Sequence, residues 1–180
     1  VDGVRYCSEY YFDETCNTRT TNGLIALYNF QEGSGNTIMD ESNFGTPLDL
    51  IIADPANTSW NNLCGVTINS STVIESATAA TKIIDAVKAS NAFTIEAWVK
   101  PANTTQDGPA RMVTLSDGSS SRNFTLGQED AEYAIRVRTD DSSTDNNGNP
   151  TRYDGAVSTT EVQHVVYTWD ANNSGTEKLY

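Results

Sequence analysis

The stretch AFTIEAWVKP, residues 92–101, decides the fold because its side chains alternate between two kinds. Successive side chains of a β-strand point to opposite faces, so a period of two predicts a strand with one buried face. The side chains expected in the core are Phe93, Ile95, Ala97 and Val99. The other face then carries Thr94, Glu96, Trp98 and Lys100.

Many other short apolar segments lie between clusters of Gly, Pro, Asn, Asp and Ser, which form turns. These segments are GLIALYNF (23–30), TIMD (37–40), PLDLII (47–52), VTI (66–68), TVIES (72–76), ARMVTLS (110–116), RNFTLGQ (122–128), EYAIRVRT (132–139) and EVQHVVYTWD (161–170). Many short strands at this spacing predict an all-β fold, a two-sheet antiparallel jelly-roll sandwich. The exception is a short helix near residues 80–89, where Ile83, Ile84 and Val87 have helical spacing.

Charge and composition restrict the possible partners. The formal net charge is −13. Nucleic acid binding needs a basic surface that releases counterions, so we exclude nucleic acid as a partner. Anionic membranes are disfavoured for the same reason, and the sequence contains no apolar run long enough to span a membrane. The charge is compatible with divalent cations, neutral sugars or a basic protein, and it also keeps a secreted protein soluble.

The three cysteines suggest a stapled N-terminal segment. Cys7 and Cys16 flank a short turn-rich stretch within residues 1–22, which read as an N-terminal extension. A Cys7–Cys16 disulfide would constrain this extension, which has little core of its own. We expect Cys64 to be buried and reduced, or paired outside the chain. Val1 begins without the charged and apolar regions of a signal peptide, so in a secreted protein that peptide has been removed or omitted.

Three motifs in order resemble the laminin-G-like, concanavalin A-like jelly-roll family. They are GLIALYNFQEGSGNTIMDES (23–42), AFTIEAWVKP (92–101) and HVVYTWDANNSGTEKLY (164–180). The resemblance covers residues 23–180 and implies one laminin-G-like domain that lacks its last strand or strands. It also implies an extracellular protein at the cell surface or secreted. Members bind carbohydrate or protein, or serve as structural modules, so the fold alone does not set the function.

The resemblance also implies calcium as a structural cofactor. Its D-x-S-x-x-G segment lies near the metal, and the matching positions here are Asp40, Ser42, Asn43 and Gly45. Calcium takes six to eight oxygen ligands, of which carboxylates and backbone carbonyls are typical. A second acidic loop, TDDSSTDNNGNP (139–150), contains a run from Ser143 that faintly resembles an EF-hand loop with Asp154 at its twelfth place. We interpret it as a long hairpin loop, because its first ligand position is a serine and no helices flank it.

The sequence offers no catalytic group, so we expect the protein not to be an enzyme. His164 is the sole histidine, and no nucleophile motif accompanies it. The resemblance implies a structural histidine at the start of this strand, so we expect His164 to be part of the scaffold. Glycoside hydrolysis needs two carboxylates, and Glu96 has no acidic partner two residues further along its strand.

The outer faces of two strands form the candidate ligand site. If the strands share a sheet, Glu96 and Trp98 could lie on one face with Arg136 and Arg138. An aromatic ring beside fixed polar groups suits a sugar, whose C–H face stacks on the ring. In the alternative interpretation this is a solvated face, where arginine covers Trp98 and pairs with Glu96.

We therefore expect a non-catalytic extracellular binding or adhesion module, with glycan as the ligand class. The alternative is a structural or assembly subunit that contacts other protein chains. The final strand ends at Tyr180 within the family's hairpin motif. An open sheet edge there would pair with another chain or with the missing C-terminal part.

Overall fold

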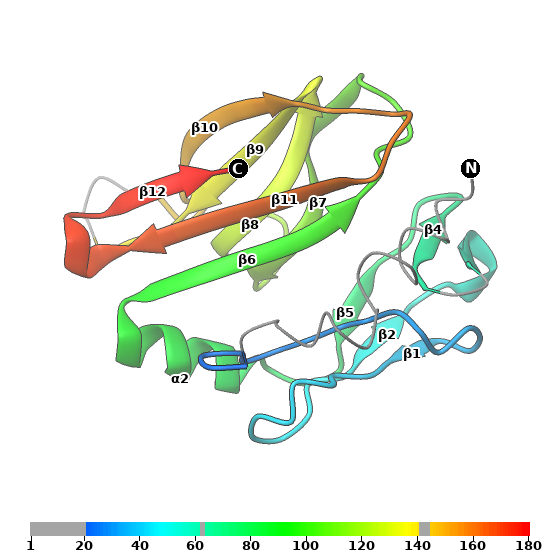
Figure 1. Cartoon of the computed structure of the whole chain (residues 1–180), viewed down its shortest axis with the longest axis horizontal. Helices are drawn as coiled ribbons and strands as arrows, with labels where there is room; N and C mark the ends of the chain where they lie inside the picture. The colour runs from blue at the N-terminus through cyan, green and yellow to red at the C-terminus, as the bar shows by residue number, and fades with distance from the viewer. Residues whose placement is uncertain (1–20, 62–63, 141–144) are drawn as a thin grey trace. The chain divides into compact units, whose positions relative to one another are not determined.

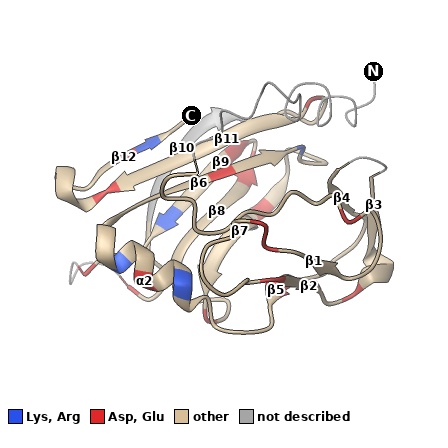
Figure 2. Ribbon diagram, turned by 60° about the horizontal axis from the view of Figure 1, so that its bottom comes forward, with Lys and Arg blue, Asp and Glu red and all other residues tan. Residues whose placement is uncertain are grey.

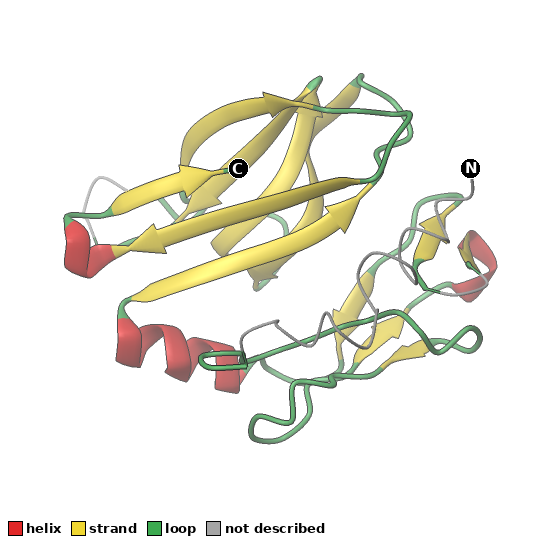
Figure 3. Ribbon diagram, viewed as in Figure 1, coloured by secondary structure: helices red, strands yellow, loops and turns green. Residues whose placement is uncertain are grey.

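The computed structural model describes residues 21–61, 64–140 and 145–180, with the backbone alone over 150–156. The chain divides into two compact units, Val1–Ala89 and Ser90–Tyr180. Antiparallel strands occur in both units and dominate the second, and one of the described helices, α2, lies where a short helix was expected (Figures 1 and 3). This confirms the predicted all-β class. Most of the predicted N-terminal extension, with Cys7 and Cys16, lies outside the described residues.

The second unit consists of two antiparallel sheets. One sheet has the strand order β10-β9-β8-β7, formed by Asn149–Ala156, Glu132–Val137, Arg122–Asp130 and Gln106–Ser116. The other has the order β12-β11-β6, formed by Thr176–Leu179, Gln163–Asp170 and Ala92–Val99. A 3-10 helix, η2 (Ala171–Asn173), connects β11 to β12.

The core of this unit lies between the two sheets. Its buried members are Ile95, Phe124, Leu126, Tyr133, Ile135, Val137, Val157, Val165 and Tyr167. Phe93 stacks on Phe124 across the sheets, with ring centroids 5.1 Å apart. The four apolar side chains predicted on one face of residues 92–101 all belong to this core or pack against it. The period of two therefore identified the buried face correctly.

The first unit contains shorter elements. One antiparallel sheet has the order β1-β2-β5, formed by Thr37–Ile38, Leu50–Ile52 and Ile74–Ser76. A second pair consists of β3 (Thr58–Trp60) and β4 (Val66–Ile68), with the 3-10 helix η1 (Pro55–Asn57) before β3. Helix α2 spans Thr81–Ser90 and confirms the helix predicted near 80–89. Its last residue belongs to the second unit by the division above.

The apolar run GLIALYNF, residues 23–30, is not a strand, although its length and composition predicted one. The reason lies in its hydrogen bonds. The Leu27 amide donates to the Asp40 carboxylate at 3.2 Å, and the Leu27 carbonyl accepts from the Glu41 amide at 2.8 Å. A side chain thus replaces the backbone partner that a regular sheet ladder would need.

Cys64 is buried, as expected, with 6% of its surface exposed. It is disulfide-bonded, so the expectation of a reduced thiol was wrong. Its bonding partner lies outside the described residues.

Two valines near the start of β11 test the sandwich core. Val165 is 2% exposed, whereas Val162 is 39% exposed. We expect Val165→Ala to lower the free energy of unfolding by about 2–3 kcal/mol, because two methyl groups leave a packed core. Val162→Ala should change it by less than about 0.5 kcal/mol. Urea unfolding of both variants measures these free energies. Equal decreases in the two variants would contradict the assignment of Val165 to the core.

Candidate functional site

The predicted site residues on β6 form a cluster with the sole histidine. In the β6–β11 pairing, His164 lies opposite Trp98 and Val166 lies opposite Glu96. The His164 and Trp98 rings stack with centroids 4.2 Å apart at an interplanar angle of 9°. His164 Nε2 lies 2.9 Å from Glu96 Oε1. His164 therefore occupies the outer face of the sheet, where it contacts the two residues that we had expected to meet a ligand.

Arg136 and Arg138 do not share a sheet face with this cluster, so that part of the prediction was wrong. Arg136 belongs to β9, which pairs with β8 and β10, whereas β6 pairs with β11 in the other sheet. Alternation along a strand fixes which face a side chain occupies, but it does not fix which strands are neighbours. Whether any of these four residues binds a ligand stays a prediction.

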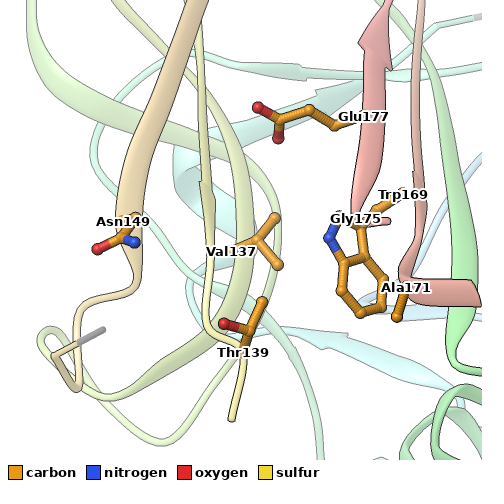
Figure 4. Close-up of a pocket in the computed structure, with 7 residues that line it drawn as sticks. All are labelled: Val137, Thr139, Asn149, Trp169, Ala171, Gly175 and Glu177. Carbon is orange, nitrogen blue, oxygen red and sulfur yellow. The ribbon is translucent and has the colours of Figure 1, made fainter. Parts of the chain in front are cut away.

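An open pocket of about 340 Å³ lies where the two sheets of the second unit meet at one end (Figure 4). Two cross-strand pairs form its opposite walls. Val137 and Asn149 are paired on β9 and β10, and Trp169 and Glu177 are paired on β11 and β12. Thr139, Ala171 and Gly175 complete the lining. The pocket therefore combines an apolar base with amide, hydroxyl and carboxylate groups.

The wall formed by β11 and β12 is held in place by its neighbours. The Trp169 ring packs against Phe93, with centroids 5.7 Å apart. The Tyr167 hydroxyl donates to Glu177 Oε2 at 2.9 Å. Burial, together with this carboxylate, raises the pKa of Tyr167, so the hydroxyl remains a donor at neutral pH. The carboxylate and the indole are thus positioned before any ligand arrives.

Sequence reasoning missed this pocket. From the sequence alone, Trp169 is expected to be a core residue of a strand, and Glu177 is expected to be a polar residue of a hairpin. The available signal was the hairpin itself, because two strands joined by a short turn place Trp169 beside Glu177. The opposite wall, formed by β9 and β10, depends on a contact between two sheets that no local pattern indicates.

The loop predicted to hold calcium surrounds the ammonium of Lys82 instead. Lys82 Nζ donates to Asp40 Oδ2, to Ser42 Oγ at 3.2 Å and to the Phe44 carbonyl at 2.9 Å. These contacts match the three N–H donors of an ammonium group. Within this set the Asp40 side chain is 0% exposed and the Lys82 side chain 10% exposed. Helix α2, which carries Lys82, has basic residues coloured blue in Figure 2.

The remaining contacts of Asp40 also come from the protein. Its Oδ1 accepts from the backbone amides of Leu27 and Ser42 at 3.2 and 3.0 Å, and its Oδ2 accepts from Leu48 at 3.0 Å. Calcium needs six to eight oxygens at 2.3–2.6 Å, with no cation already among them. No group of three or more His, Cys, Asp or Glu side chains that could hold a metal occurs in the described part of the chain. The residues at Asp40, Ser42, Asn43 and Gly45 therefore do not fit a calcium ion.

Ionisation of Asp40 depends on this network. Burial opposes the charged form, but the hydrogen bonds from Lys82, Leu48 and Ser42 outweigh it. Together they hold the pKa of Asp40 well below its usual range. The carboxylate therefore remains charged throughout the neutral and mildly acidic range.

Two lysines of helix α2 allow a matched test of this network. Lys82→Met leaves a buried carboxylate without its cation, and loss of one partner from a buried ion pair costs about 3–5 kcal/mol. Lys88 lies on the same helix and is exposed, so Lys88→Met should cost less than about 0.5 kcal/mol. Thermal unfolding of both variants measures the difference. The melting temperature of the wild type should be unchanged by calcium or by a chelator, and a calcium-dependent rise would contradict the assignment.

The lowered pKa of Asp40 also predicts acid sensitivity. A carboxyl group whose pKa is lower in the folded chain than in the unfolded chain stabilises the folded state. This stabilisation is complete at pH values above the pKa in the unfolded chain, which is about 3.9 for aspartate. That stabilisation is lost as the pH falls from about 4 towards the folded pKa. We expect the free energy of unfolding, measured with urea at a series of pH values, to fall more steeply below pH 4 in the wild type than in Asp40→Asn. The substituted side chain cannot titrate. If the free energy of unfolding falls equally steeply with pH in the two proteins, Asp40 is not the cause of the acid sensitivity.

Comparison with known proteins places the chain in a family. A laminin G family model, described as the concanavalin A-like lectin/glucanases superfamily, matches residues 75–180. Comparisons with curated proteins and with solved structures give no match. The matched region exceeds half of the chain and contains all the strands of the two-sheet unit. The chain therefore belongs to the concanavalin A-like lectin/glucanase superfamily.

Proposed function

We propose that the protein is a non-catalytic extracellular module that binds carbohydrate in the pocket between β9–β10 and β11–β12. One observation carries the proposal. An indole and a carboxylate, both fixed by neighbouring side chains, face an amide and a hydroxyl across an open pocket of about 340 Å³ (Figure 4). The superfamily supports the broader role of a binding module.

The lining matches the surface of a sugar. A sugar ring presents C–H groups on its face, which pack on an aromatic ring, and hydroxyls on its edge, which need polar partners. Trp169 supplies the ring, and Asn149 and Glu177 supply the polar partners. Small-ligand sites typically measure about 300–1,000 Å³, so this pocket suits one sugar unit better than a long chain.

A binding role is favoured over hydrolysis. Glycosidases use two carboxyl groups about 5–9.5 Å apart, one on each side of the bond that breaks. Among the described residues that line the pocket, Glu177 is the one carboxylate. Its Oε2 already accepts from Tyr167, which suits a fixed acceptor more than a mobile acid or base.

Two observations support an extracellular location. Laminin-G-like domains are typically extracellular, and Cys64 forms a disulfide, which persists mainly in oxidising compartments. Separately, none of the described helices has the length and apolar character needed to cross a membrane.

A second candidate function is assembly with other protein chains. Among the described strands, β12 pairs with β11 alone and so forms one edge of its sheet. Tyr180, just after it, is 67% exposed. Strand edges with exposed aromatic residues favour pairing with another strand. Concentration-dependent assembly without glycan binding would favour this function over the first.

Two substitutions in the pocket test sugar binding. Glu177→Gln removes a charged acceptor and Asn149→Ala removes an amide, so each should weaken glycan binding about tenfold or more. Glu161→Gln is the matched control, because Glu161 is exposed and outside the pocket lining. A glycan array identifies a ligand, and calorimetry then compares affinities. Unchanged affinity in both pocket variants would place the site elsewhere, and hydrolysis of the ligand would overturn the non-catalytic role.

A further inference from the structure

Three arginines gather on the outer face of the sheet β10-β9-β8-β7. Arg136 lies opposite Thr125, and Arg111 lies opposite Gly127. These positions alternate with core residues such as Leu126, so they face away from the core. Arg122 lies opposite Ser116, after a register shift that brings it onto the same face. Basic residues on the strands are blue in Figure 2.

Two of the guanidinium groups converge on one backbone oxygen. Arg111 Nη2 and Arg122 Nη2 each donate to the Ser119 carbonyl at 2.8 Å. Arg111 Nη1 also lies 3.4 Å from the Gly118 carbonyl and 3.5 Å from Ser116 Oγ. The β7–β8 turn therefore holds two cationic side chains against each other.

The described hydrogen-bond acceptors of these three arginines are all neutral. Arg136 Nη1 lies 3.5 Å from the Gly148 carbonyl, which is at the limit of a hydrogen bond. No carboxylate of the described residues forms an ion pair with Arg111, Arg122 or Arg136. Asp145 is the acidic neighbour that influences Arg122. In a chain with 24 acidic residues, three adjacent arginines with no ion-paired carboxylate in the described part of the chain need a physical explanation.

The cluster carries an electrostatic cost in the free protein. Burial, and then the charges of Arg111 and Arg136, lower the pKa of Arg122, while Asp145 opposes this. The Arg122 Nε atom is buried and has no hydrogen-bond partner among the described residues. An anion beside the three guanidinium groups would relieve the repulsion between them.

From this geometry we infer that Arg111, Arg122 and Arg136 bind an oxyanion group, a sulfate or carboxylate, carried by an acidic polysaccharide. Each guanidinium has five N–H donors in a planar fork that matches two oxygens of such a group. Among the described residues, Arg122 and Arg136 each donate to one backbone carbonyl, and each guanidinium has five N–H donors in all. The inference rests on the proposed function only in taking a glycan as the carrier of the anion.

The net charge of −13 does not prevent this binding. At physiological ionic strength, salt screens charges beyond about 8 Å, so remote acidic residues act weakly on a ligand at the cluster. The site also differs from the sugar pocket. Arg136 is on the outer face of β9, whereas its neighbour Val137 lines the pocket from the inner face. The two sites can therefore be tested separately.

Three polysaccharides distinguish the ligand chemistry. Dextran sulfate and neutral dextran share a backbone and differ in sulfate, and polygalacturonate carries carboxylates instead. We expect the wild type to bind at least one acidic polymer at least tenfold more tightly than neutral dextran, with affinity falling as salt rises. Preference for dextran sulfate would identify sulfate as the anion, and preference for polygalacturonate would identify carboxylate. Binding of neither acidic polymer above neutral dextran would overturn the inference.

Matched variants then locate the site. The single variants Arg111→Gln and Arg136→Gln should each weaken binding of the acidic polymer at least tenfold. Arg111→Lys keeps the charge but loses the planar fork of donors, so it should weaken binding less than Arg111→Gln. Lys178→Gln removes an equal charge from β12 of the other sheet and should change affinity less than twofold. Equal weakening by Lys178→Gln and by the arginine variants would show attraction by general charge and overturn the site. Thermal unfolding of every variant checks that the fold is retained.

The test of the arginine cluster can be distinguished from the test of the sugar pocket. Glu177→Gln should leave binding of the acidic polymer unchanged, while the arginine variants should leave binding of a neutral glycan unchanged. If the pocket variants lose no affinity for any sugar, the proposed sugar site is refuted. The binding of the acidic polymer then still decides whether the arginine cluster is a site. If Glu177→Gln weakens the acidic polymer as much as the arginine variants do, the separate site is refuted.

Discussion

The register between β6 and β11 is the constraint on which the second unit depends. The two strands pair along their full length, from Val99 with Gln163 to Ala92 with Asp170. Since the side-chain period is two, a slip of one residue would turn Val165 and Tyr167 outward and His164 inward. The same register places Trp169 beside Phe93 at the end of the sandwich. One pairing thus sets the core, the outer cluster around Trp98 and one wall of the pocket.

The two proposed binding surfaces use the same sheets in different ways. The pocket draws on inward positions at the strand ends, where the sheets separate and the core gives way to polar groups. The arginine cluster draws on outward positions near the β7–β8 turn, where the backbone carbonyls of Gly118 and Ser119 hold the side chains. An inward site encloses a ligand and selects by shape, whereas an outward site attracts it by charge.

The sequence predicted local features well and distant ones poorly. Alternation identified the buried face of residues 92–101, and helical spacing located α2, because both signals are contained in one element. Neighbouring strands were not predictable, so Arg136 was wrongly placed beside Trp98. The partner of Asp40 was also missed, because Lys82 lies on a helix 42 positions away in the sequence. The run from Leu24 to Phe30 has the composition of a strand, but Asp40 takes one of its backbone donors.

The ammonium of Lys82 gives the loop around Asp40 a cation that is part of the chain. A free ion stabilises a folded protein by mass action, so its contribution grows with the concentration of the ion relative to its dissociation constant. A tethered cation has no such dependence, because it is always present in a ratio of one to one. Its effective concentration is set by helix α2 and not by the surrounding medium. The loop therefore keeps the same electrostatic support whether the surroundings are rich or poor in divalent ions.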